Sequence, residues 1–172
     1  MKMDATGLTP EQYELLKRYY WPDEEDEEIE EDDFLAQLTT PEELHQLAWK
    51  YNWDDGAGIP DWIIKQPFCD RGTALLLFWR AAPGPCYYAY ANREELSQTK
   101  TLLFDLDFYD LVQEIEEKYL SGFFSQQNIA FNPANDQGTD WIKENLDVKV
   151  KREIPAIMLE PTPGRVLERA SF

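Results

Sequence analysis

The alternation of apolar and polar positions predicts a series of short amphipathic helices separated by strong turn signals. Thr9-Pro10-Glu11-Gln12 and Thr40-Pro41-Glu42-Glu43 both have the threonine and Gln/Glu spacing of a helix-capping box, with proline at the first helical position. After the second signal, one helical face carries the apolar residues Leu44, Leu47, Ala48 and Tyr51. We therefore expect a helix to begin after each threonine and to bury one side.

The stretch from Tyr51 to Trp79 organises the rest of the chain. It contains turn-forming residues, a short predicted helix over Asp61 to Gln66, and then the most apolar run in the sequence, Ala74 to Trp79. Asp70 is expected to cap the helix that carries this run. Because the run is apolar on all sides, that helix should be central and surrounded by the others.

The remaining pattern predicts one long helix and a tail. Asp107 is expected to cap the long helix, and Gly122 to end it in the left-handed conformation. A shorter helix is expected over Thr139 to Leu146, whereas Val148 to Lys151 alternates like an edge strand. Ile154 to Leu159 is extended at best, so a docked tail and a small hairpin both remain open.

The whole pattern indicates a mainly α fold. We expect a compact multi-helix domain of short helices around a central apolar helix, with an irregular or short-β C-terminal tail. A length of 172 residues is typical of one domain with appendages. The predicted parts are an N-terminal helix and acidic segment over residues 1–37, a helical core domain over 38–133, and a C-terminal extension packed on the core over 134–172.

Charge adds a functional expectation to this fold. The chain has 34 acidic and 16 basic residues and a net charge of −18. Residues 1–35 account for 13 of the acidic residues and 3 of the basic ones. Such a field repels nucleic acid and anionic membranes and attracts cationic partners. We therefore expect a basic protein partner, no nucleic acid and no membrane contact.

Residues 23–33 read DEEDEEIEEDD, and we name this run the acidic segment. Its composition is typical of a solvated linker. Ile29, followed by Phe34 and Leu35, indicates instead that part of the segment packs down. As the candidate partner-binding residues we take its ten carboxylates: Asp23, Glu24, Glu25, Asp26, Glu27, Glu28, Glu30, Glu31, Asp32 and Asp33.

The stretch after Tyr51 also gathers carboxylates, which raises the question of catalysis. Asp54, Asp55 and Asp70 allow the alternative of a metal-dependent hydrolase or transferase. Caps and turns explain all three, since Asp70 precedes a helix and the other two lie in a turn. The single histidine, His45, belongs to another predicted helix. We therefore predict no catalytic residue, no metal site and no cofactor.

Several turns of this stretch resemble a known family. The sequence runs Asn52-Trp53-Asp54, Gly56, Pro60, Cys69-Asp70 and Gly72-Thr73-Ala74-Leu75 before the apolar helix. This pattern is similar to that of the family called domain of unknown function 4274, over roughly Leu38 to Pro133. The resemblance implies a bacterial, mostly helical domain with no assigned activity. The signature residues, expected to be structural, are Asn52, Trp53, Asp54, Gly56, Pro60, Cys69, Asp70, Gly72 and Thr73.

These observations lead to a functional hypothesis. By analogy, small acidic proteins of this kind are often immunity partners of bacterial toxins. We expect a non-enzymatic acidic binding protein, and most specifically an immunity protein that neutralises a cationic toxin or effector by direct binding. The alternatives are the metal-dependent enzyme above and a DNA-mimic inhibitor.

The expected compartment follows from three features. Cys69 and Cys86 show neither metal spacing nor a redox pair, which is typical of packed thiols in a reducing compartment. The first residues lack the apolar region of a secretory signal. The run Ala74 to Trp79 is too short to cross a bilayer. We therefore expect a cytoplasmic protein.

Overall fold

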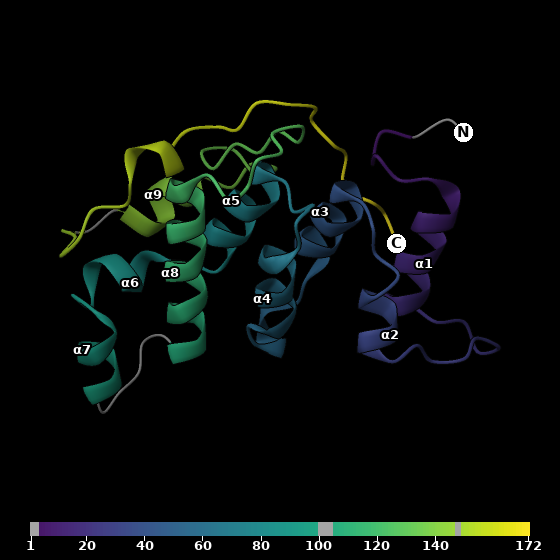
Figure 1. Ribbon diagram of the computed structural model, residues 1–172, viewed down its shortest axis with the longest axis horizontal. Coiled ribbons are helices and arrows are strands. Elements are labelled where there is room, and N and C mark those ends of the chain that lie inside the picture. The colour runs from purple at the N-terminus through teal and green to yellow at the C-terminus, as the bar shows by residue number, and fades with distance from the viewer. Residues whose placement is uncertain (1–3, 100–104, 147–148) are drawn as a thin grey trace.

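The computed structural model describes residues 4–99, 105–146 and 149–172, and these ranges are mainly helical (Figure 1). The predicted fold class is confirmed, and these ranges contain no strand or sheet, only isolated bridges joining Ile129 to Arg165 and Asp136 to Thr139. The elements are α1 (Pro10–Tyr20), α2 (Glu31–Leu35), α3 (Pro41–Lys50), the 3-10 turn η1 (Trp53–Asp55), α4 (Gly58–Lys65), α5 (Arg71–Arg80), α6 (Gly84–Tyr88), α7 (Arg93–Gln98), α8 (Leu106–Ser121), α9 (Trp141–Leu146) and the 3-10 turn η2 (Ala156–Met158).

Local capping signals explain where most helices begin. Both predicted capping boxes are confirmed, because the Thr9 and Thr40 hydroxyls accept the backbone N–H groups of Gln12 and Glu43. The predicted cap of α8 is wrong by two residues. Asp105 is the N-cap residue, and its carboxylate accepts the backbone N–H of Asp107 at 2.8 Å. The two aspartates stand two residues apart, so local pattern alone could not choose between them.

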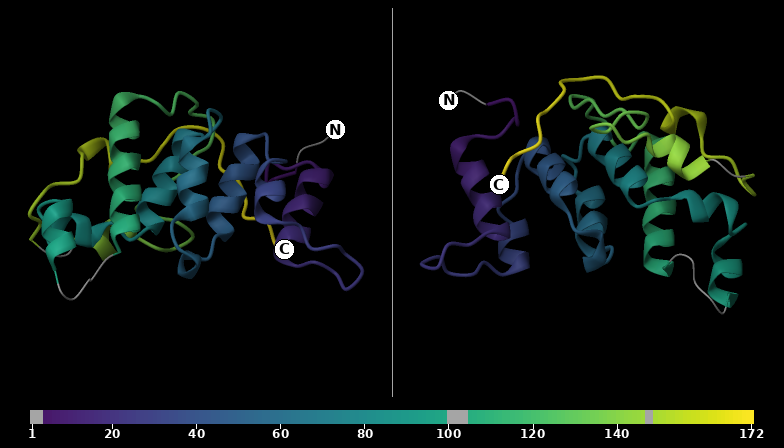
Figure 2. Two further views of the ribbon diagram at one scale, coloured as in Figure 1. Left: turned by 60° about the horizontal axis from the view of Figure 1, so that its bottom comes forward. Right: turned by 180° about the vertical axis from the view of Figure 1, so that it is seen from behind.

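The apolar run of α5 lies at the centre of the molecule, as predicted. Every side chain from Ala74 to Trp79 is fully buried. In Figures 1 and 2, α3, α4, α5 and α8 stand side by side across the long axis of the molecule, with α1 and α2 at one end and α6 and α7 at the other. α5 packs against α3 on one side and against α8 on the other. Burial of its apolar side chains therefore joins the two ends of the molecule through one core.

The C-terminal tail is docked, and no hairpin forms among its described residues. The edge-strand prediction is wrong for residues 149–151, while Val148 lies outside the described residues. Instead, the backbone N–H groups of Lys151 and Arg152 both donate to the carbonyl of Tyr87, at 2.7 and 3.0 Å. The expectation of an extended 154–159 is also wrong, since η2 interrupts it where Trp79 Nε1 donates to the Met158 carbonyl at 2.9 Å.

Beyond η2 the tail crosses the top of the molecule and ends between α1 and α3 (Figure 1). Ala130 N–H donates to Arg165 O at 3.0 Å, and Arg165 N–H donates to Asn128 O at 2.8 Å. Farther along, the Gln46 side chain of α3 accepts from Ala170 N–H and donates to Glu168 O. The tail therefore ties the α8 end of the molecule to the α1 end.

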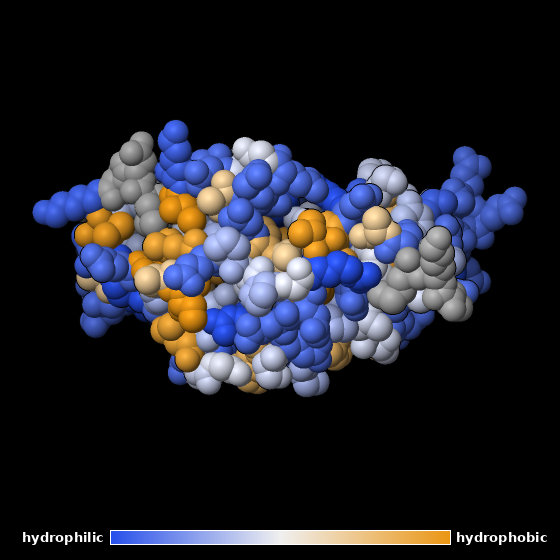
Figure 3. Space-filling model, turned by 90° about the horizontal axis from the view of Figure 1, so that it is seen from above, coloured by the Kyte–Doolittle hydropathy of each residue, from blue (hydrophilic) through white to orange (hydrophobic). Residues whose placement is uncertain are grey.

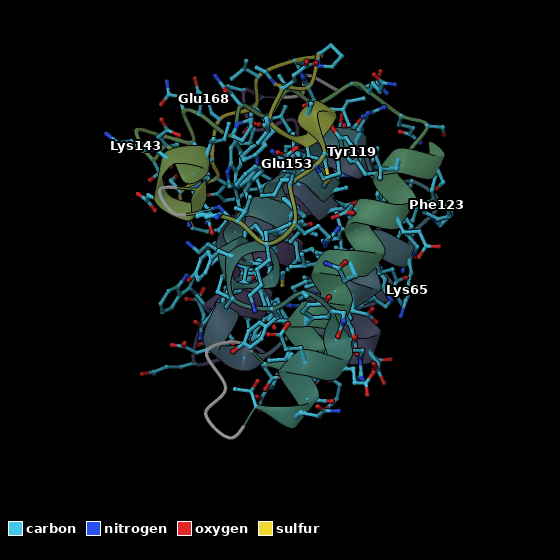
Figure 4. The ribbon with its side chains drawn as sticks, turned by 90° about the vertical axis from the view of Figure 1, so that its left-hand side faces the viewer. Lys65, Tyr119, Phe123, Lys143, Glu153 and Glu168 are labelled. Atoms are coloured by element: carbon cyan, nitrogen blue, oxygen red, sulfur yellow. The ribbon has the colours of Figure 1, made fainter. Side chains whose placement is uncertain are left out.

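The surface carries apolar residues where α8 ends and where the tail passes it. In Figure 4, Tyr119 faces inward toward the tail while Phe123 lies on the outer side. Seen from above in Figure 3, hydrophobic residues gather toward the α8 side and the α1 end is largely hydrophilic. None of the helices in the described ranges combines the length and apolar character needed to cross a membrane.

Candidate functional site

The acidic segment forms a loop between α1 and α2 and then the first turn of α2. Figure 2 shows this loop projecting from the α1 end of the molecule in both views. Asp23 and Asp26 close a turn, since Asp26 N–H donates to Asp23 O and Asp23 N–H donates to the Asp26 carboxylate. Ile29 is half-buried, and Phe34 and Leu35 are buried beneath the segment. The predicted packing of these apolar residues is confirmed, and they fix the far end of the loop to the core.

All ten carboxylates of the acidic segment are on exposed residues. Across residues 4–99, 105–146 and 149–172, none of them forms an ion pair. The nearest basic residues in sequence are Lys17 and Arg18, and Lys17 is paired with Glu14 at 3.9 Å. Like charges held close together raise the negative potential at that surface, so a cationic group approaching it gains Coulomb energy.

Several grooves flank the acidic segment, and two of them are lined mainly by charged residues. The first, which we name the Trp21 groove, has a volume of about 440 Å³ and lies between α1 and the loop. It is lined by four acidic and two basic side chains together with Trp21, which is 62% exposed. The second, of about 500 Å³, is lined by Ile29 and five charged residues, of which only Arg18 is basic. An exposed tryptophan ring beside carboxylates can bind the cationic side chains of an arginine- or lysine-rich surface.

The first signature residues occupy a turn on the surface of the core. The Asn52 side chain accepts the N–H of Asp54 at 3.2 Å, which begins η1. Gly56 follows with a φ of +89°, a conformation that favours glycine. Trp53 packs edge-on against Tyr51 at 5.5 Å, and Pro60 is buried in the first turn of α4. This part of the signature therefore turns the chain from α3 into α4.

The later signature residues join α5 to the segment after α8. Asp70 is fully buried, and its carboxylate accepts N–H groups from Gly72 at 2.8 Å, Asn128 at 2.7 Å and Ile129 at 3.4 Å. Burial raises the pKa of Asp70, and these hydrogen bonds oppose that rise. A Cβ on Gly72 would lie 2.2 Å from the Ile129 carbonyl oxygen, so the close approach requires glycine.

Thr73 and Cys69 complete the buried part of the signature. Thr73 Oγ1 lies 2.9 Å from Nδ1 of His45, which is fully buried. The Cys69 thiol is also buried, and desolvation raises its pKa, which opposes formation of the thiolate. Both cysteines are free and buried, as the sequence predicts.

The aspartates of the enzymatic alternative do not share one environment. Asp54 and Asp55 are exposed on η1, whereas Asp70 is fully buried and already accepts three backbone hydrogen bonds. Within the part of the chain that the structure describes, no group of three or more His, Cys, Asp or Glu side chains could hold a metal ion.

Sequence reasoning missed a buried polar network around Asp136. Its carboxylate accepts from Trp49 Nε1 at 3.2 Å, Arg80 Nε at 3.1 Å and Trp141 Nε1 at 2.9 Å. The sequence indicates only a turn at this position, because two of the three donors, Trp49 and Arg80, belong to distant segments. The available signal was an aspartate in the turn just before the predicted helix that carries Trp141, and it is a weak one.

Comparison with protein families now identifies the core. Residues 39–120 match the model of the family described as Domain of unknown function (DUF4274). This segment is similar to that family. The match contains every signature residue from Asn52 to Thr73, but it stops before Ile129 and leaves the acidic segment outside. Neither curated proteins nor solved structures give a match to the chain.

Proposed function

We propose that this protein is a non-enzymatic acidic binding protein that recognises a basic protein through the acidic segment and the Trp21 groove. In its most specific form the proposal is a bacterial immunity protein, acting in the cytoplasm, that neutralises a cationic toxin or effector by covering it. The observation that carries the proposal is a surface of ten exposed carboxylates without an ion pair among the described residues, anchored to the core and flanked by grooves.

Charge supports the encounter step of this function. Complementary potentials accelerate association and select against anionic competitors, and their effect falls as ionic strength rises. The acidic segment is well placed for this role because it projects from one end of the molecule (Figure 2). A basic partner can therefore reach its carboxylates without displacing a helix.

Affinity requires contacts that exclude water, and the Trp21 groove offers them. Tryptophan is enriched among the residues that dominate binding energy in interfaces. The Trp21 ring stands at the exposed end of α1, and Leu15 of the same helix lines the groove beneath it. We expect an arginine or lysine of the partner to lie over this ring while its charge meets Asp23 or Asp26.

The test is capture of a basic partner by matched charge variants. In the first variant, Glu24, Glu25, Glu27 and Glu28 become glutamine. In the control variant the same number of charges is removed from exposed glutamates elsewhere: Glu117, Glu144, Glu153 and Glu160. The candidate partner is a basic protein encoded by a neighbouring gene, co-expressed and purified with each variant at a low and at a higher salt concentration.

We expect the wild-type protein and the control variant to retain the partner and the first variant to lose it at the higher salt concentration. Co-expression of the wild type should also rescue growth of cells that carry the partner, if the partner is toxic. Equal retention by both charge variants would overturn the role of the acidic segment. Failure to capture any basic protein would overturn the proposed function.

A further inference from the structure

Another cavity lies between the N-terminal helix and the segment that matches DUF4274. Its volume is about 300 Å³, which is at the lower end of the range for small ligand sites. α1 supplies Tyr19 and Tyr20, the acidic segment supplies Glu31, and residues 51–59 supply the opposite wall. The complete lining is Tyr19, Tyr20, Glu31, Tyr51, Asn52, Asp55, Gly58 and Ile59. No basic side chain is among these residues, so the cavity is both aromatic and acidic.

The aromatic rings of this tyrosine cavity are held in place by their own packing. Tyr19 stacks on the buried Phe34 with ring centroids 3.8 Å apart, and it meets Tyr20 edge-on at 5.3 Å. Tyr51 donates its hydroxyl to the Gly56 carbonyl at 2.8 Å and packs edge-on against Trp53. Rings that are already ordered lose little conformational entropy when a ligand enters.

The polar groups of the cavity are poorly neutralised. Among the described residues, Asp55 makes no ion pair, and the one side-chain donor to Glu31 is the Tyr19 hydroxyl, at 3.3 Å. The Tyr20 hydroxyl is buried and finds no hydrogen-bond partner among residues 4–99, 105–146 and 149–172. Burial, and then the Asp55 carboxylate, raise the pKa of Tyr51 to about 12. The tyrosines therefore stay neutral while the two carboxylates carry the charge.

From this geometry we infer that the tyrosine cavity receives the cationic end of an arginine or lysine side chain from the basic partner. Aromatic rings around a cation attract it through their quadrupoles, and the attraction grows as water is excluded. Asp55 and Glu31 supply the countercharge, and the Tyr20 hydroxyl offers an oxygen acceptor to the entering N–H group.

This inference rests on the proposed function and adds the residue class that the partner must present. It also places the specificity in a cavity that is only partly formed by the residues that match the family. Tyr19, Tyr20 and Glu31 lie outside the matched residues 39–120, whereas Tyr51 and Asp55 lie inside them. The N-terminal part of this chain thus completes a cavity that the family segment only half forms.

The test is an NMR titration of the full chain, with ¹³C-labelled tyrosine rings, by four probes. Two are capped tripeptides with a central arginine or lysine, one is the same tripeptide with neutral citrulline, and one is free spermidine. We expect the arginine and lysine peptides to bind with dissociation constants on the order of 1 mM and to shift the ring signals of Tyr20 and Tyr51. The ring of Tyr13, which lies outside the cavity lining, should not shift.

Two pairs of variants separate the cavity from general acidity. Asp55→Asn should weaken binding of the arginine peptide about fivefold. Asp54→Asn should leave it unchanged, because the adjacent, exposed Asp54 does not line the cavity. Tyr20→Leu should abolish the ring shifts, and Tyr13→Leu is its control because both tyrosines also pack against Phe172. If Tyr20→Leu does not fold, the aspartate pair still decides the question.

The inference is overturned if the citrulline peptide binds as well as the arginine peptide, if only spermidine binds, or if Asp54→Asn and Asp55→Asn weaken binding equally. Its failure is distinguishable from that of the proposed function. Partner capture that depends on the acidic segment, without peptide binding in the cavity, removes only the cavity inference. Peptide binding without capture of a basic protein removes the immunity role.

Discussion

Arg80 and Asp136 form an ion pair in the interior, with Arg80 Nη2 3.0 Å from a carboxylate oxygen of Asp136. The Asp136 side chain is only 1% exposed. The same carboxylate accepts the indole N–H groups of Trp49 and Trp141. One side chain therefore holds together α3, α5 and α9. Because the pair is largely buried, removal of one member leaves the other without its countercharge.

Asp136→Ala is expected to lower the free energy of unfolding by about 3–5 kcal/mol, since it strands Arg80 and two indole N–H groups. The measurement is urea unfolding followed by tryptophan fluorescence. Asp61→Asn is the control, because it breaks a more exposed pair with Lys65 at 2.6 Å and should lower the free energy by less than about 1 kcal/mol. Equal effects of the two variants would contradict a stabilising role for the buried network.

His45 is expected to make stability depend on pH. Burial lowers its pKa to about 3, with nearby Asp136 opposing and Arg80 reinforcing the change. The unfolded chain binds the proton near pH 6.5 and the folded chain does not, so this contribution to stability is complete above pH 6.5 and is lost progressively as pH falls toward 3. Well below pH 6.5 the loss approaches about 1.4 kcal/mol per pH unit.

The check is urea unfolding of the wild type and of His45→Gln between pH 7 and pH 5. Burial also raises the pKa of Asp70. Its titration therefore acts on stability in the opposite direction, and it does so in the wild type and in the variant alike. We expect the wild type to lose more stability than the variant over these two pH units. Parallel pH profiles would show that His45 takes up its proton in the folded state.

Local signals account for the parts of this fold that the sequence predicts. Thr9 and Thr40 start helices through contacts three residues away, and the run from Ala74 to Trp79 is buried because no face of it is polar. The exposure of the acidic segment follows in the same way from its composition. Each of these predictions needed only neighbouring residues.

The parts that were wrong or missed depend on contacts between distant segments. Asp136 bonds to Arg80 across 56 residues and to Trp49 across 87, so its turn-forming neighbours could not reveal it. The alternation around Lys151 suggested a strand, but the available acceptor was Tyr87 at the end of α6. Tyr19 and Tyr20 fit an ordinary helix stripe, and only the placement of Tyr51 opposite them creates a cavity.

Gly164 is expected to be essential for docking of the tail. Its φ is +122°, and a Cβ there would lie 2.4 Å from the carbonyl carbon of Asn128. Gly164→Ala should therefore lower the free energy of unfolding by about 2 kcal/mol or more, through backbone strain and a steric clash. Gly138 has a φ of +95°, and a Cβ there would meet no atom within 4 Å. Gly138→Ala should therefore lower the free energy of unfolding by backbone strain alone, about 1 kcal/mol.

Hydrogen exchange of the Ala130 and Arg165 amides provides a second readout of the same pair of variants. These amides donate to backbone carbonyls across the tail. We expect both to exchange faster in Gly164→Ala and to be unchanged in Gly138→Ala. Faster exchange in both variants would mean that global destabilisation, not local undocking, explains the effect.

The two cysteines are expected to be unreactive in the folded protein. Burial raises the pKa of Cys86 to about 12 and that of Cys69 still further. A neighbouring cation would favour the thiolate of Cys69, but the guanidinium of Arg71 lies over the Tyr119 ring, 4.2 Å from its centroid. Near neutral pH, the thiol reagent dithiobis(nitrobenzoate) should modify neither cysteine of the folded protein within minutes. Both cysteines should react once the protein is unfolded in about 6 M guanidinium. Rapid modification of Cys69 in the native protein would contradict its burial in the core.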